Sequence, residues 1–117
     1  MKTALLVVAL VLSSSLPAFA QNARSEAEKH VKFGISVAQY NLWREAISRF
    51  ELAADIDPTY AAAFNNLAIA YEQQGDLDRA RKAYEQAMKL EPDNQYIKQN
   101  YELFREINDR ATRKDSQ

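Results

Sequence analysis

Few residues in this chain could do chemistry, and the first to consider is its single histidine, His30. A histidine can act as a general base or a metal ligand, but either role needs partner groups at defined spacing. His30 has no second histidine, no cysteine and no carboxylate motif at ligand spacing around it. We therefore interpret His30 as a packing residue, and the sequence predicts neither a metal site nor a catalytic base.

Two acidic pairs, Asp55 with Asp57 and Asp76 with Asp78, lie at turn signals. Helix capping and solvation explain aspartates at such positions without a metal. The chain also lacks the G-x-S-x-G, H-E-x-x-H, P-loop and G-x-G-x-x-G patterns. The sequence therefore predicts no enzyme activity and no cofactor, which leaves a surface as the functional element.

Composition indicates what must position that surface. The 117 residues allow one small domain, and with only 2 glycines and 3 prolines they favour helix. The absence of cysteine excludes a disulfide framework, a thiolate zinc site and a cysteine nucleophile. The formal net charge is −1 and the charges are interspersed, so the sequence predicts no nucleic-acid partner.

The first twenty residues have the pattern of a secretory signal peptide. Lys2 is followed by an apolar run, Ala4–Leu12, and by the small-x-small sequence Ala18-Phe19-Ala20. The run is shorter than the about 20 apolar residues of a membrane-spanning helix. We expect cleavage after Ala20, a mature chain from Gln21, a periplasmic or secreted location, and no stable membrane anchor. An uncleaved signal anchor is the alternative.

An internal repeat organises the rest of the chain. Residues Ala61–Asn94 align with Ala27–Tyr60 at an offset of 34, and residue size is kept at each matched position. The matched pairs are Phe33 with Leu67, Gly34 with Ala68, Ala46 with Ala80, Phe50 with Tyr84, Ala53 with Ala87, Ile56 with Leu90, and Pro58 with Pro92.

This period and residue pattern resemble the tetratricopeptide repeat (TPR) family. The second copy carries a residue of the family signature at Leu67, Ala68, Tyr71, Gly75, Ala80, Tyr84, Ala87 and Pro92. The first copy departs from the signature at His30, Val37 and Asn41. The resemblance implies an all-α, helix-turn-helix solenoid with two full repeats and a C-terminal capping helix.

The pattern has a physical basis. Small residues mark the places where paired helices approach closely, and large ones fill the space between them. Asn41 stands where the second copy has Gly75, and asparagine tolerates the left-handed turn conformation. We expect Ser25 and Asp76 to cap helix N-termini. The large core residues are expected to be Phe33, Phe50, Leu67, Tyr71 and Tyr84.

The expected organisation follows in order along the chain. Helices are predicted at about Ser25–Tyr40, Trp43–Asp55, Tyr60–Gln73, Leu77–Leu90 and Gln95–Arg113. The segments are a signal peptide at 1–20, a lead-in at 21–26, a first repeat at 27–60, a second repeat at 61–94, a capping helix at 95–113, and a frayed tail at 114–117.

The last helix is predicted to cap the solenoid, because solenoid ends need a polar outer face. Its apolar stripe would dock on the preceding pair and consists of Ile97, Tyr101, Phe104 and Ala111. Its charged side would end the array and consists of Lys98, Glu102 and Arg105. A dimerising coiled coil is the alternative, but the run spans barely two heptads.

The resemblance implies that the first helix of each pair lines a concave groove that binds a protein or peptide. Val31 and Ile35 stand where a carboxylate clamp would need Lys and Asn, so we reject a clamp. The same strip could instead form a homo-oligomer interface, or its side chains could shield one another. The predicted groove residues are Val31, Ile35, Asn65, Ile69, Glu72, Tyr96, Gln99, Leu103 and Ile107.

Overall fold

The computed structural model describes the backbone of residues 4–117 and the side chains of residues 18–117. This part of the chain is all-α, as predicted, with no strand. The helices are α1 (Ala4–Ala38), α2 (Trp43–Ile56), α3 (Ala61–Gln73), α4 (Leu77–Leu90) and α5 (Gln95–Asp115).

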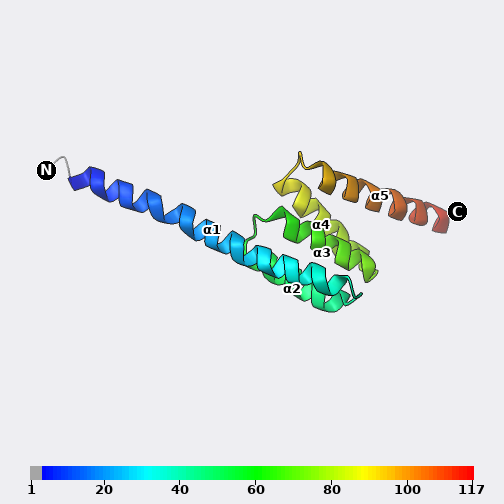
Figure 1. The fold of residues 1–117 in the computed structure, drawn as a ribbon. Helices are drawn as coiled ribbons and strands as arrows, with labels where there is room; N and C mark the ends of the chain where they lie inside the picture. The colour runs from blue at the N-terminus through cyan, green and yellow to red at the C-terminus, as the bar shows by residue number, and fades with distance from the viewer. Residues whose placement is uncertain (1–3) are drawn as a thin grey trace.

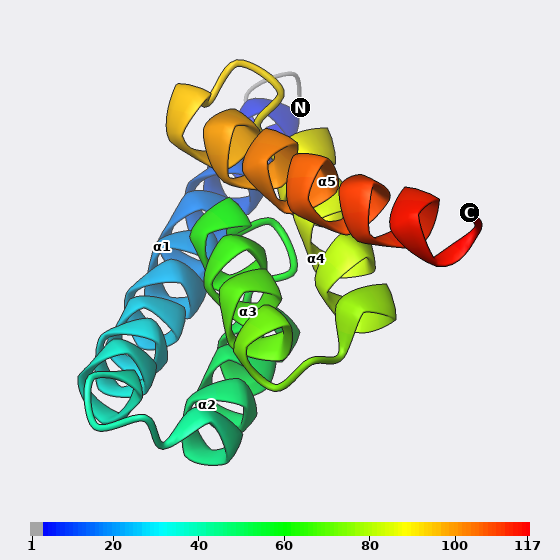
Figure 2. The same ribbon diagram turned by 90° about the vertical axis from the view of Figure 1, so that its right-hand side faces the viewer.

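The helices form two successive hairpins and a final helix. Helix α3 packs against α1 and α2 on one side and against α4 on the other, and α5 crosses over α4 (Figure 2). The first half of α1 projects away from the bundle, so the two ends of the chain lie at opposite ends of the molecule (Figure 1). The arrangement is that of a short helical solenoid.

The two hairpin turns use the left-handed conformation that the repeat predicts. Asn41 has φ 61° and Gly75 has φ 77°, at positions 34 residues apart. Asp76 then caps α4, because its carboxylate accepts a hydrogen bond from the backbone N–H of Arg79 at 3.2 Å. Both turn predictions and this cap are confirmed.

The predicted start of the first helix at Ser25 is wrong, because α1 runs without a break from Ala4. Residues 18–24 include alanine, glutamine and arginine, which favour helix. The helix therefore continues through Ser25 instead of beginning there. The predicted signal peptide falls mostly on residues whose side chains lie outside the described part and stays a prediction. Among the described residues, no helix combines the length and apolar character needed to cross a membrane.

The core consists of small residues at helix crossings with aromatic rings between them. Ala46, Ala80, Phe50 and Tyr84 are all buried, as predicted. Phe33 is an exception to the prediction, because 47% of it is exposed. It lies on the outer side of α1, where the Arg49 guanidinium lies 4.2 Å from the centre of its ring.

Helix α5 covers the C-terminal end of the bundle. Ile97 and Phe104 are buried, and the ring of Phe104 lies 5.3 Å from that of Tyr84. Lys98, Glu102 and Arg105 are exposed, as the capping prediction requires. Ala111 is also exposed, contrary to its place in the predicted stripe, because the end of α5 extends past the bundle.

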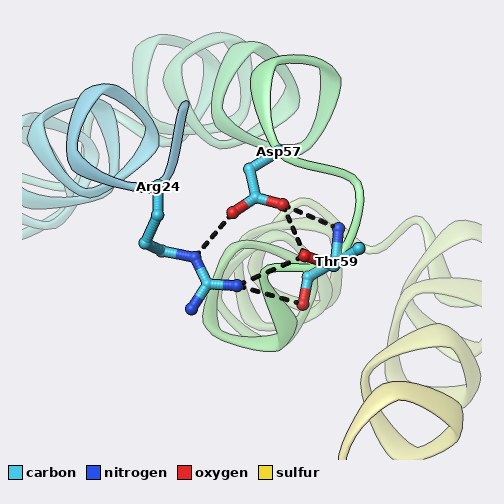
Figure 3. Close-up of polar contacts among 3 residues, drawn as sticks. All are labelled: Arg24, Asp57 and Thr59. Atoms are coloured by element: carbon cyan, nitrogen blue, oxygen red, sulfur yellow. Dashed lines mark hydrogen bonds and ion pairs between the residues drawn. The ribbon is translucent and has the colours of Figure 1, made fainter. Parts of the chain in front are cut away.

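A partly buried ion pair joins α1 to the turn between α2 and α3 (Figure 3). Arg24 Nε donates to Asp57 Oδ2 at 2.6 Å, and the other carboxylate oxygen accepts from the backbone N–H and the hydroxyl of Thr59. The Arg24 guanidinium also lies 4.5 Å from the ring centre of Tyr60. Burial by itself would raise the pKa of Asp57, but the hydrogen bonds from Thr59 and Arg24 outweigh it and lower that pKa.

Candidate protein-binding groove

The candidate groove is built on three apolar residues that the repeat places in a row. Ile35, Ile69 and Leu103 are 34 residues apart and lie on α1, α3 and α5. Ile35 and Ile69 line one cleft between α1 and α3. Leu103 lies one helical turn after Asn100, which contacts Asn65 on α3. Ile35 and Leu103 are exposed and Ile69 is half-buried, so this row presents apolar surface to solvent.

A cleft of about 230 Å³ lies at the α1–α3 end of this row. Its apolar walls come from Ile35 and Ile69 together with the Trp43 and Phe50 rings of α2. Ala38, Gln39 and Asn66 complete the lining, and the two amides provide hydrogen-bonding groups. The cleft can hold one apolar side chain with a polar group beside it.

Helix α5 extends the apolar surface beyond the cleft. Tyr96, Leu103 and Ile107 are all exposed, and Gln99 is exposed on the same helix. Asn100 holds α5 to α3, because its amide nitrogen donates to the Asn65 side-chain oxygen at 3.3 Å. The α5 residues are therefore fixed relative to α3 by a direct polar contact.

Two of the nine predicted groove residues do not face solvent. Val31 is 4% exposed and belongs to the main core cluster between α1 and its neighbours. Asn65 is 3% exposed and its side chain is used in the contact with Asn100. The expectation that these two side chains line a groove is therefore wrong, because the packing of the first helices covers them.

Glu72 lies on the groove side of α3 but is half-buried and already bound within the chain. Its carboxylate accepts a hydrogen bond from the Tyr84 hydroxyl at 2.9 Å. Burial first, and then the Glu72 charge and hydrogen bond, raise the pKa of Tyr84. On α3, burial and the bond to Glu51 likewise raise the pKa of Tyr71 to about 12. Both tyrosines are therefore structural hydrogen-bond donors at neutral pH.

The residues that could do chemistry are engaged in local contacts. The His30 ring lies 3.6 Å from a Glu26 oxygen and 3.4 Å from Arg49 Nη1, on the side of α1 away from the groove. No group of three or more His, Cys, Asp or Glu side chains gathers within the described part of the chain.

Trp43, Phe50 and Asn66 line the cleft but were not among the predicted groove residues. Trp43 begins α2 two residues after the left-handed turn residue Asn41, and its side chain lines the cleft. The position just after a left-handed turn was the available signal.

Comparison with known proteins gives the same fold. The chain superposes on the Sgt2 TPR domain from Aspergillus fumigatus with a TM-score of 0.69 and 22% identity, over 74% of this chain and 59% of that one. The geometry and this likeness define the class as a helix-hairpin solenoid of the TPR type. Residues 61–94 match the family model described as tetratricopeptide repeat, so this segment is a tetratricopeptide repeat.

Similar curated proteins share the repeat region. The chain is 32% identical over 68 residues to the chloroplastic TPR domain-containing protein PYG7 of Arabidopsis thaliana, covering 58% of this chain and 23% of that protein. It is 36% identical over 67 residues to mouse O-mannosyl-transferase TMTC1, covering 57% of this chain and 7% of that protein. It is 44% identical over 72 residues to the probable N-acetylglucosaminyltransferase SPINDLY of Petunia hybrida, covering 62% of this chain and 8% of that protein. This chain thus spans less than a quarter of each of these relatives.

Proposed function

We propose that this chain is a non-enzymatic protein-interaction module that binds a segment of another protein across α1, α3 and α5. The observation that supports this most directly is the row of Ile35, Ile69 and Leu103. Each is apolar and at least partly exposed, and Ile35 and Leu103 expose 41% and 57% of their surface, while Ile69 packs partly against the core. Apolar side chains kept in register on successive helices provide contiguous contact area for a peptide or helix.

We also propose that the module acts outside the cytoplasm after removal of its first twenty residues. The support is the sequence pattern of Met1–Ala20. N-terminal sequencing of protein purified from the envelope of the source cell tests this. The expected N-terminus is Gln21, and recovery of Met1 in the mature fraction would contradict it.

The groove is tested by changing its exposed residues. Ile69 packs partly against the core, so Leu103→Lys and Ile35→Lys are cleaner variants than a change at Ile69. We expect each to reduce capture of partners by immobilised protein at least tenfold, because a charge then faces the apolar ligand. The matched control is Leu52→Lys, which changes a similarly exposed residue on α2.

Circular dichroism should show the same helical content in all three variants. If the Leu103→Lys and Ile35→Lys proteins capture the same partners as the Leu52→Lys protein, the groove is not the binding surface.

A homo-oligomer formed through the same surface is the second candidate. The observation that favours it is the exposure of Tyr96, Leu103 and Ile107 on one helix, which a second copy could cover. Light scattering at high micromolar concentration decides it. A strictly monomeric wild-type protein would eliminate this candidate and leave the partner-binding proposal in place.

A further inference from the structure

A second groove lies between α1 and α2, away from the candidate binding groove. Phe33 lines this second groove, whereas Ile35 lines the candidate binding groove. Two residues along a helix differ by about 200° in direction, so the two grooves lie on opposite sides of α1. The second groove has a volume of about 430 Å³. Its lining residues are Phe33, Val37, Arg44, Glu45, Ser48 and Arg49. We call it the α1–α2 groove.

The repeat shows what normally lies on this side of a hairpin. The equivalent groove between α3 and α4 is lined by Phe64 and Gln86 and by five residues that each stand 34 residues after a member of the first, namely Leu67, Tyr71, Arg79, Lys82 and Ala83. Leu67 is only 7% exposed, whereas its equivalent Phe33 is 47% exposed.

The difference follows from the helix that precedes each hairpin. Helix α2 packs against α3 on this side, and Glu51 of α2 accepts the hydrogen bond from Tyr71 at 2.6 Å. The helices that pack against α1 are α2 and α3, and α2 forms the other wall of the α1–α2 groove. Within the described part of the chain, α1 thus lacks the covering helix that α3 has.

The charges around the α1–α2 groove indicate the chemistry of a covering helix. Two of its lining residues, Arg44 and Arg49, are basic, and one, Glu45, is acidic. Among residues 18–117, neither arginine is within ion-pair distance of a carboxylate. The Arg49 guanidinium lies 4.2 Å from the centre of the Phe33 ring and its Nη1 lies 3.4 Å from His30 Nδ1, so its remaining N–H groups are beside an apolar surface. Arginine in that setting prefers a carboxylate, which it can bind through two hydrogen bonds.

We propose that the α1–α2 groove is the docking surface for an acidic amphipathic helix of a partner protein. Its apolar side chains lie on Phe33 and Val37, and its carboxylates pair with Arg44 and Arg49. The packing of α2 beside α3 is the internal precedent for a helix on this side of a hairpin, although its acidic residue Glu51 pairs there with the Tyr71 hydroxyl and not with an arginine. A second copy of the chain fits less well, because a symmetric contact would bring the same two arginines of both copies together.

The probe is a fluorescein-labelled helical peptide with Leu and Ala on one face and Glu along its flanks, beside an otherwise identical peptide with Gln for Glu. Binding to the intact protein is followed by fluorescence anisotropy. We expect the Glu peptide to bind at least tenfold more tightly than the Gln peptide, and its affinity to fall as salt is raised. Phe33→Ala and Arg49→Glu should each weaken it about tenfold or more.

A charge exchange makes the test specific. A third peptide with Lys for Glu should bind Arg49→Glu protein more tightly than wild type. Lys98→Glu makes the same charge change on exposed α5 and should leave binding of the Glu peptide unchanged. Leu103→Lys should also leave it unchanged, so failure of this proposal is distinguishable from failure of the groove on α1, α3 and α5.

Three results would overturn the proposal. One is the absence of binding of the Glu peptide at concentrations up to about 1 mM. Another is equal loss in Lys98→Glu and Arg49→Glu proteins, or displacement of the peptide by a single-stranded oligonucleotide at equal charge, which would indicate a general response to anions. The third is a wild-type dimer that Phe33→Ala abolishes, since a second copy would then cover the groove.

Discussion

Arg24 and Asp57 are 33 residues apart in the chain and form an ion pair of 2.6 Å that joins α1 to the turn before α3. The carboxylate is almost completely buried, whereas the Arg24 side chain is 42% exposed. A buried carboxylate that loses its charge partner is costly, but a partly exposed arginine weakens the pair through solvent screening. The hydrogen bonds from Thr59 to the same carboxylate further stabilise its charged form.

We therefore expect Asp57→Asn to lower the free energy of unfolding by about 1–2 kcal/mol, because charge-assisted hydrogen bonds are replaced by weaker neutral ones. Urea unfolding at neutral pH measures the change. Asp55→Asn is the matched control, since Asp55 is exposed two residues away and should change stability by less than about 0.5 kcal/mol. Equal effects of the two substitutions would show that the Asp57 contacts are not stabilising.

The same carboxylate predicts a pH dependence. Its pKa in the folded protein is lower than its ordinary value of about 3.9. The stabilisation is therefore complete above pH 4 to 5 and is lost as the pH falls through the ordinary pKa toward the lowered one. We expect the difference in unfolding free energy between wild type and Asp57→Asn to be constant from pH 7 to about pH 5 and to shrink below about pH 4. Urea unfolding of both proteins across this range measures it, and an undiminished difference at pH 3 would contradict the assignment.

Gly34 predicts a packing effect that opposes helix propensity. A Cβ at Gly34 would overlap the ring of buried Phe50, so the ring could not stay in place. Alanine gains about 1 kcal/mol over glycine in a helix, but overpacking costs about 1–3 kcal/mol. We expect Gly34→Ala to lower the unfolding free energy by about 1 kcal/mol in thermal or urea unfolding.

A double-mutant cycle separates the two terms. Phe50→Leu removes the ring, so Gly34→Ala should be neutral or stabilising in that background. Ser36→Ala, at an exposed position of α1, is the comparison for helix propensity, and it also removes the hydrogen bond from the Ser36 hydroxyl to the Phe33 carbonyl. If Gly34→Ala is equally destabilising with Leu at position 50, the close approach to Phe50 is not the cause.

Most of the fold could be predicted because its information is local and repeated. The 34-residue offset, the left-handed turn residues and the small-large alternation locate the hairpins and their buried faces. Helix periodicity shows which residues share a face, but it does not show whether a neighbour covers that face. Phe33 was expected to be buried because it is a large residue that matches Leu67 in the repeat, yet Leu67 is 7% exposed and Phe33 is 47% exposed.

The candidate site was only partly predictable for the same reason. Helix periodicity correctly predicted that Ile35 on α1 and Tyr96, Leu103 and Ile107 on α5 are exposed. The burial of Val31 and Asn65 could not be predicted in this way, because it depends on how closely the helices approach one another. The Arg24–Asp57 pair joins distant segments, and nothing in the local sequence of either residue signals it.

Two neighbouring residues of α5 test the difference between core and surface on one helix. Phe104 is 1% exposed and packs on the Tyr84 ring, whereas Leu103 is 57% exposed in the candidate groove. Phe104→Ala leaves a cavity under α5 and should lower the unfolding free energy by about 3–5 kcal/mol. Leu103→Ala should change it by less than about 0.5 kcal/mol while weakening capture of a partner.

Thermal unfolding of the two variants beside wild type, with pull-down of partners at a temperature where all three are folded, measures both properties. If Leu103→Ala destabilises the fold as much as Phe104→Ala does, the Leu103 side chain is part of the core and the row on α1, α3 and α5 is not a free surface. If Leu103→Ala leaves both stability and capture unchanged, α5 caps the solenoid without contributing to binding.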